Sequence, residues 1–381
     1  MTMQTQIQLS APARSYALVA HLPHAISQSR ILILITLLHL AAAHSISAWY
    51  AIPLESGAAM KLLKMLQYII PCFMIFLMFW RFGYMALFVR PQSPTRWFLA
   101  DARHFCLDPG RLSTGIVAFV TISFFTISFT FLKGMIPQIN PYSWDPALAQ
   151  FDRWLHGGTD PYVLLAPLLD TPLVTTWLNA AYHSWFFLLY FVTFVACFDR
   201  DNPVRRNTFL IGFVLMWALG GNLLATVLSS GGPVYYQAFG YGDTFVPLMD
   251  KLHAFAAVSP VWALDVQDML LDGYLNDGPI VGISAMPSMH LASSALMTCY
   301  AFTWRPWAGW LMVPFTLIIM LGSVHLGWHY AIDGYLGILI GIAGWYVARA
   351  IARAFHTKPR AIHRANLPEA KGECHFQSEP S

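Results

Sequence analysis

The chain has 381 residues, of which 57% are hydrophobic and only 11% are charged. Soluble domains carry about 25% charged residues, so this composition excludes a soluble globular enzyme. The formal net charge of +3 gives no reason to expect a nucleic acid as a partner. The five cysteines are scattered without a CxxC pair, so neither a disulfide framework nor a zinc site is expected.

Apolar runs long enough to cross a hydrocarbon core of about 30 Å recur along the chain. A β-barrel would instead need segments of about 10 residues with alternating polarity, and the sequence has no such pattern. Prolines in two of the runs are compatible with membrane helices, because neighbouring helices satisfy the freed backbone groups. We therefore predict an all-α polytopic membrane bundle with about eight spans, at residues 31–52, 65–89, 112–133, 173–198, 207–228, 286–304, 308–325 and 331–355.

Lysine and arginine are unevenly divided between the two sides of this topology. With the N-terminus inside, most of the 22 lysines and arginines fall on the inner side, and the outer side keeps Lys61, Lys64, Lys133, Arg153 and Lys251. Cytoplasmic loops collect basic residues, so both termini are predicted to be cytoplasmic. The short loops favour a bacterial inner membrane, although an internal eukaryotic membrane with a lumenal site would look similar.

Two long outer loops, at about 134–172 and 229–285, are rich in Asp, Trp and Tyr and are predicted to cap the outer face. Residues 145–169 show helix-like apolar spacing that is broken by Gly157 and Gly158. This pattern fits either a helix lying along the membrane surface or a packed helical lid.

Three ionisable residues, His290, His329 and Asp333, fall where hydrocarbon or interface is expected. Such residues are costly in a membrane and are therefore functional candidates. His329 and Asp333 are four residues apart, so on a helix they share a face and the carboxylate can fix the imidazole tautomer. The second ring nitrogen is then available as a nucleophile or base, although an isolated pair of this kind is often structural.

Two segments are candidate phosphate-binding loops. Ser288 precedes His290 at the predicted start of a helix, where free N–H groups favour a bound anion. A Ser-Gly-Gly-Pro loop follows the fifth span, and we expect Ser230, Gly231 and Gly232 to donate hydrogen bonds to the same anion.

The combination of Pro287-Ser288-x-His290 with His329-x-x-x-Asp333 resembles the second and third signature motifs of the type 2 phosphatidic acid phosphatase superfamily. The residues around His329 are most similar to the branch that contains inositol-phosphorylceramide synthases. The resemblance covers about residues 140–355 and implies a core of six helices. Together with the predicted topology, it divides the chain into a cytoplasmic segment (1–30), N-terminal transmembrane helices (31–135), a catalytic transmembrane domain (136–356) and a cytoplasmic tail (357–381), whose polar composition is typical of disorder.

The resemblance also implies a role for each matching residue. His329 attacks phosphorus to form a phosphohistidine, Asp333 orients it, His290 protonates the leaving oxygen and Ser288 holds a phosphate oxygen. Neither a metal ion nor another cofactor is implied. Two cationic ligands of the superfamily are missing, however: Ser323 occupies the position of an arginine, and the first motif has no match on the outer side, since Arg305-Pro306 lies inside.

The missing cations argue against ordinary phosphomonoesterase activity and are compatible with the synthase branch. The first signature of that branch is an aromatic helix with a histidine, which Asn179, Tyr182 and His183 resemble. Tyr182, His183 and His325, which shares a helical face with His329, are therefore further candidate site residues.

We expect an integral membrane phosphotransferase that moves a phospho-headgroup from a lipid phosphoester to a lipid or polyol alcohol. A lipid phosphate phosphatase with the same site is the alternative, because water and an alcohol differ only in the second half-reaction. The aromatic cap favours transfer, since a cap excludes water. Two other classes remain open: a di-iron membrane hydroxylase, because His325, His329 and Asp333 line one helical face, and a transporter or scaffold.

Overall fold

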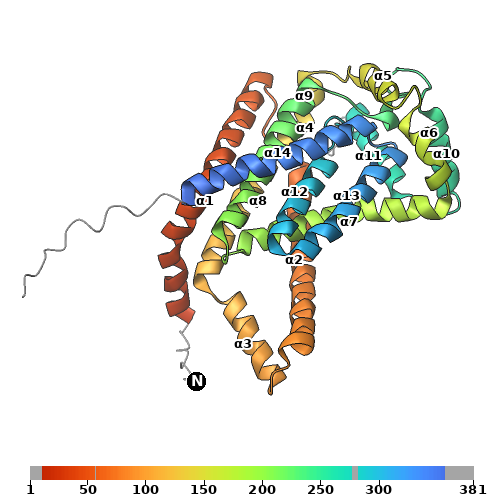
Figure 1. Ribbon diagram of the computed structural model, residues 1–381. Coiled ribbons are helices and arrows are strands. Elements are labelled where there is room, and N and C mark those ends of the chain that lie inside the picture. Colours follow the sequence, from red (N-terminus) through yellow and green to blue (C-terminus); the bar gives the residue numbers. More distant parts are fainter. Residues whose placement is uncertain (1–10, 56, 277–281, 357–381) are drawn as a thin grey trace, which may run out of the picture.

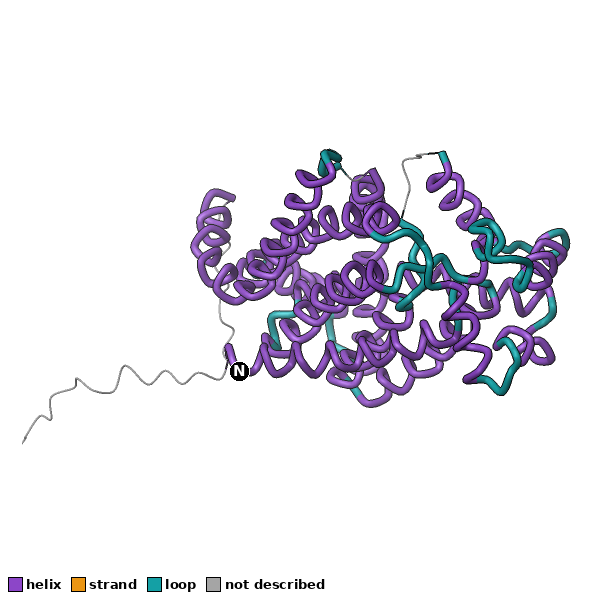
Figure 2. The backbone as a smooth tube through the Cα atoms, turned by 90° about the horizontal axis from the view of Figure 1, so that it is seen from above, coloured by secondary structure: helices purple, strands orange, loops and turns teal. Residues whose placement is uncertain are grey.

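The computed structural model describes residues 11–55, 57–276 and 282–356, and these residues form helices joined by loops, without a strand (Figures 1 and 2). The predicted all-α bundle is therefore confirmed. The predicted tail at 357–381 lies outside the described residues. The long helices are α1 (Ala11–Tyr50), α2 (Gly57–Tyr84), α4 (Pro109–Ile139), α7 (Pro172–Phe198), α8 (Pro203–Met216), α12 (Met289–Trp304), α13 (Pro306–His325) and α14 (Ala331–His356).

Within the described ranges, seven helical segments are long and apolar enough to cross a membrane. They correspond to seven of the predicted spans, although the first of them, Ala17–Tyr50, starts well before residue 31. The remaining prediction, 286–304, falls on α12, which has only 16 residues. Spanning a bilayer takes about 20 residues. This short helix packs between α13 and α14, inside the bundle.

Proline is the first residue of six of the described α-helices. Its missing N–H and fixed φ suit the first turn, where no intrahelical donor is needed. Side chains of Asp108, Thr171 and Asn202 accept hydrogen bonds from the next N–H groups and complete the starts of α4, α7 and α8. The helices that begin with proline are α3 (Pro94–Cys106), α4, α6 (Pro161–Leu169), α7, α8 and α13.

Two glycines bring α8 close to its neighbours. α8 continues through a π-helical turn, η2 (Trp217–Leu224), into the short α9 (Ala225–Val227). A Cβ atom on Gly221 would lie 2.9 Å from the Phe129 ring of α4, and one on Gly220 would lie 3.3 Å from the Met289 sulfur of α12. The glycine pair therefore permits close packing of η2 against both α4 and the start of α12.

The loops predicted to share the inner side meet at one end of the bundle. Ion pairs join Arg200 to Asp108 at 2.5 Å and Arg205 to Asp199 at 2.7 Å. The Arg30 guanidinium of α1 also lies 4.8 Å from the Phe355 ring centroid near the end of α14.

The opposite end carries the cap, which we define as residues 140–171 and 229–276. It contains α5 (Asp145–Leu155), α6, η3 (Pro233–Tyr235), α10 (Val246–Ala256) and α11 (Trp262–Leu275). α5, α6, α10 and α11 gather at one side of the bundle in Figure 1. The predicted break in the helical segment 145–169 is confirmed, since Gly157 and Gly158 separate α5 from α6 with φ of 70° and 86°. α5 buries Leu148 and exposes Trp154, so it has both a packed face and an outward aromatic face.

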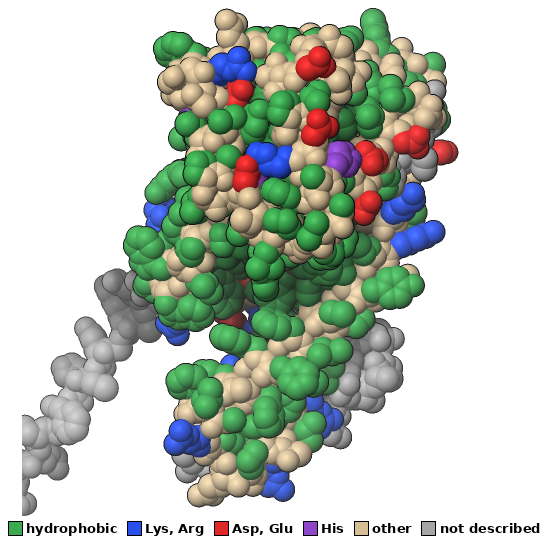
Figure 3. Space-filling view, turned by 90° about the vertical axis from the view of Figure 1, so that its right-hand side faces the viewer, with side chains coloured by type: hydrophobic (Ala, Val, Ile, Leu, Met, Phe, Trp, Pro, Cys, Tyr) green, Lys and Arg blue, Asp and Glu red, His purple; other side chains and the backbone are tan. Residues whose placement is uncertain are grey.

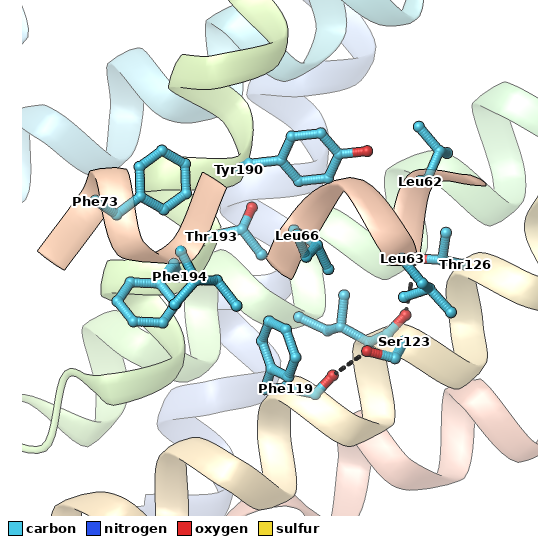
Figure 4. A pocket seen from close by; sticks show the side chains of 12 residues that line it. Leu62, Leu63, Leu66, Phe73, Phe119, Ser123, Thr126, Tyr190, Thr193 and Phe194 are labelled. Atoms are coloured by element: carbon cyan, nitrogen blue, oxygen red, sulfur yellow. Dashed lines mark hydrogen bonds between the residues drawn. The ribbon is translucent and has the colours of Figure 1, made fainter. Parts of the chain in front are cut away.

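The face seen in Figure 3 carries many hydrophobic side chains, and the acidic side chains on it lie mainly in its upper half. An apolar pocket lies between α2, α4 and α7 (Figure 4). Its lining contains none of the predicted site residues. It includes Leu62, Leu63, Leu66, Phe119, Tyr190 and Phe194.

Candidate active site

His329 and Asp333 form a hydrogen-bonded pair at the start of α14. His329 precedes the helix by two residues, so the pair spans the α13–α14 turn rather than one helical face. The His329 Nδ1 atom lies 3.3 Å from Asp333 Oδ2, which also accepts the Tyr330 N–H at 3.0 Å. The Nε2 atom of His329 has no hydrogen bond to any described residue. With the carboxylate accepting from Nδ1–H, Nε2 carries the free lone pair.

His290 faces this pair from the first turn of α12. The ring centroids of His290 and His329 are 6.2 Å apart. Two aromatic rings of α7 hold the His290 imidazole: Tyr182 stacks on it at 4.4 Å and Trp185 lies at 3.9 Å, both measured between centroids. The structure therefore brings both histidines and the candidate Tyr182 together.

Three buried polar atoms near the histidines lack a hydrogen-bond partner among the described residues: Ser288 Oγ, Asp333 Oδ1 and Tyr182 Oη. Buried polar groups are nearly always hydrogen-bonded in folded proteins. The Ser288 backbone, in contrast, is fixed, because its N–H donates to the Asp333 carbonyl at 3.0 Å. The free polar atoms are therefore positioned to bind a ligand or water molecules.

Close crossing of α12 and α14 assembles the site. A Cβ atom on Gly337 would lie 2.3 Å from the Ser288 carbonyl oxygen, and one on Gly341 would lie 2.1 Å from the Ala292 carbonyl oxygen. Two glycines four residues apart allow membrane helices to approach this closely. This Gly-x-x-x-Gly pair was visible in the sequence but was not used in the sequence analysis.

Gly231 and Gly232 of the Ser-Gly-Gly loop do not have their predicted role. The N–H groups of Gly231 and Gly232 each donate to the Asp145 carboxylate at 2.8 Å, so they are not free for a phosphate. The Ser230 hydroxyl accepts the Met286 N–H at 3.1 Å, and the Ser230 carbonyl accepts the Ala285 N–H at 2.9 Å. The loop therefore supports the segment before Ser288, and a buried carboxylate from α5 takes its two glycine N–H groups.

Two acidic residues of α5 brace the His329 turn, and the sequence analysis missed both. Besides the two glycine N–H groups, Asp145 accepts the Tyr330 hydroxyl at 2.9 Å. Asp152 accepts the N–H groups of Ala331 and Ile332 at 3.0 and 3.1 Å. Burial raises the pKa of both carboxyl groups, and the hydrogen-bond donors oppose this shift. Their seven-residue spacing, which places them on one face of a helix, was the available signal.

We expect Asp145→Asn to destabilise the protein by about 1–3 kcal/mol, because three donors converge on this carboxylate and an amide would set its own N–H groups against one of them. The thermal midpoint in detergent, compared with that of the exposed control Asp250→Asn, measures the effect. Equal midpoints for the two variants would show that Asp145 does not support the loop.

The hydrogen bonds of His183 and His325 go to residues other than His290, His329 and Asp333. The His183 Nδ1 atom donates to the Asn179 carbonyl at 2.8 Å, and its ring lies 6.2 Å from that of Trp262, between centroids. His325 turns away from the pair, because its Nε2 bonds the Thr175 hydroxyl at 2.8 Å and its Nδ1 lies 3.8 Å from Asp170.

The geometry supports neither a metal site nor a cationic phosphate ligand at position 323. Among the described residues, no group of three or more His, Cys, Asp and Glu side chains is arranged to hold a metal ion. Ser323, at the position of the superfamily's arginine, is buried and its hydroxyl donates to the Met320 carbonyl at 2.8 Å.

A family model described as the PAP2 superfamily matches residues 146–347. The match covers more than half of the chain and includes His290, His329 and Asp333, and the protein belongs to the PAP2 superfamily. Membership indicates a membrane protein of the phosphatase or phosphotransferase type. No curated protein and no solved structure matches the chain significantly.

Proposed function

We propose that this protein is a metal-independent lipid phosphotransferase that works through a phosphohistidine at His329. The observation that carries the proposal is the geometry of His329, whose Nδ1 contacts Asp333 while its Nε2 is unpaired and its ring faces His290. A histidine oriented by a carboxylate and opposed by a second histidine is suited to nucleophilic attack with general acid assistance.

In the first half-reaction, His329 Nε2 attacks phosphorus and the bond from phosphorus to the leaving alkoxide breaks. Protonated His290 transfers its proton to that oxygen. Asp333 holds the Nδ1–H of His329 and stabilises the positive charge of the ring, and the Ser288 hydroxyl donates to a phosphoryl oxygen. In the second half-reaction, an acceptor hydroxyl gives its proton to His290 and attacks phosphorus, which releases neutral His329.

Transfer to an alcohol is favoured over hydrolysis by the aromatic cap, since excluding water protects a phosphohistidine. Tyr235 and Tyr236 are buried in the cap, and the Trp328 ring is parallel to that of Tyr182, with centroids 6.3 Å apart. The position of Tyr182 beside His290 supports assignment to the branch that resembles inositol-phosphorylceramide synthases. Hydrolysis of a lipid phosphate by the same site is the second candidate function.

We also propose the membrane orientation and domain division that the sequence predicts. The cap end would face the outside of a bacterial inner membrane, and both termini would be cytoplasmic. Residues 136–356 would form the catalytic domain, which is supported by the positions of Asp145, His290 and His329 within it.

The test is a product analysis with purified protein in the presence of a chelator. Phosphatidic acid and phosphatidylinositol serve as donors, each with and without ceramide or diacylglycerol as acceptor. We expect headgroup transfer that requires the acceptor, is lost in His329→Gln and is retained in the control His253→Ala, which alters an exposed histidine of α10. Free phosphate formed from phosphatidic acid without an acceptor would instead establish a phosphatase. A folded protein that is inactive with every donor would contradict the proposal.

A further inference from the structure

A cation for the substrate phosphate is missing from the site as the superfamily motifs define it. A transferring phosphoryl group carries negative charge on its equatorial oxygens, and positively charged groups commonly stabilise that charge. Ser323 supplies none, since it stands where the superfamily has an arginine. The structure offers a replacement from outside the matched segment: Lys133, near the end of α4.

Lys133 lies beside the loop that leads to Ser288. A Cβ atom on Gly282 would lie 3.2 Å from Lys133 Cγ, so the lysine stem runs along this loop. Gly282 has a φ of 119°, a conformation that other residues rarely adopt. Because glycine has no Cβ atom, this position also leaves room for the Lys133 side chain.

The helix face that carries Lys133 packs against η2, which in turn contacts the start of α12. Phe129 lies one turn earlier on α4 and contacts Gly221, and a Cβ atom on Gly221 would also lie 3.4 Å from Met289 Cγ. Residues four apart share a helical face. Lys133 thus projects from the turn after Phe129, beside the loop that leads to Ser288.

Lys133 has no hydrogen bond or ion pair with any residue that the structure describes. It is half-buried, and a charge inside a membrane protein is costly without a partner. The lysine and the arginine of the cap are paired: Lys251 with Asp170, and Arg153 with Asp160 at 2.7 Å. The described residues therefore supply no anionic partner for the Lys133 ammonium.

We propose that Lys133 binds the phosphoryl oxygens of the substrate, so that α4, which precedes the matched segment, completes the active site. The inference rests on the proposed function and names a residue that replaces the superfamily's missing cation. The alternative is that the Lys133 ammonium extends to the membrane interface and touches no substrate.

Three variants test this proposal. Lys133→Met removes the charge at similar length, Lys133→Arg keeps the charge, and Lys64→Met removes the charge of an exposed lysine of α2. Loss of one charge-assisted contact is expected to lower kcat/KM for the lipid donor, and to weaken inhibition by orthovanadate, by about 10- to 100-fold. Lys133→Arg should recover most of both quantities, and Lys64→Met should match the wild type.

A binding measurement separates failure of this inference from failure of the proposed function. Orthovanadate and inorganic phosphate mimic the phosphoryl group, and each should raise the thermal midpoint of the wild type in detergent. The increase should disappear in Lys133→Met even if no lipid donor turns over. If folded Lys133→Met were inhibited by vanadate as strongly as the wild type, or showed the same midpoint increase, the role of Lys133 would be overturned. Inactivity of the wild type with every lipid, together with a lysine-dependent midpoint increase, would overturn only the proposed reaction.

Discussion

Replacing His329 with glutamine is expected to lower phosphoryl transfer on the order of 10⁴-fold or more, because the variant has no nucleophile for the covalent step. Glutamine keeps a polar side chain beside Asp333, so the fold should be retained. The direct measurement is trapping of labelled protein after mixing with a donor labelled in its phosphate. The label should be stable in alkali and labile in acid, as a phosphohistidine is, and absent from the variant.

His253→Ala provides the matched control, since it removes an exposed histidine from α10. It should label to the wild-type extent. Label that persists in His329→Gln would move the nucleophile to another residue, and His290 would be the first to test because its ring faces that of His329. A wild-type protein that transfers phosphate without any trapped label at short times would instead argue for direct transfer between donor and acceptor.

Replacing His290 with alanine should lower the rate with a lipid donor by about 10²- to 10⁴-fold, the range typical of a lost general acid. The loss should be far smaller with a nitrophenyl phosphoester, because nitrophenolate leaves without a proton. The comparison of the two donors, at saturating concentration and in the same detergent, measures the proton transfer separately from binding.

The matched control for this comparison is Tyr182→Phe, which keeps the ring stacked on His290 and removes only the hydroxyl. It should affect both donors alike. An equal loss with both donors in His290→Ala would mean that His290 positions the substrate or the neighbouring rings and donates no proton in the rate-limiting step.

The proposed site depends on helices from both predicted domains. His290 and His329 come from the matched segment, whereas Lys133 comes from α4. The predicted boundary at residue 135 falls within α4, which runs from Pro109 to Ile139. A shortened chain beginning after residue 135 would therefore lack Lys133, so the inference about this lysine extends the proposed catalytic unit into α4.

The sequence alone determined the membrane-bundle class, the approximate spans and the His329–Asp333 pair. These features depend on local information: apolar length, proline at helix starts and spacing within a few residues. The short helix α12 shows the limit of this information, because its 16 residues become a bundle element only through packing against α13 and α14.

Only the tertiary structure decided which partners these polar and charged groups have. Gly231 and Gly232 look like anion-binding donors in the sequence, but Asp145, more than 80 residues away in the chain, takes their N–H groups. His325 shares the His329 spacing pattern, yet it bonds Thr175 of another helix. Lys133 reads as an ordinary outer charge, and only the fold places its side chain beside Gly282 in the loop that leads to Ser288. In each case the partner is set by long-range packing, since a hydrogen bond or an ion pair depends on positions in space that local sequence spacing does not encode.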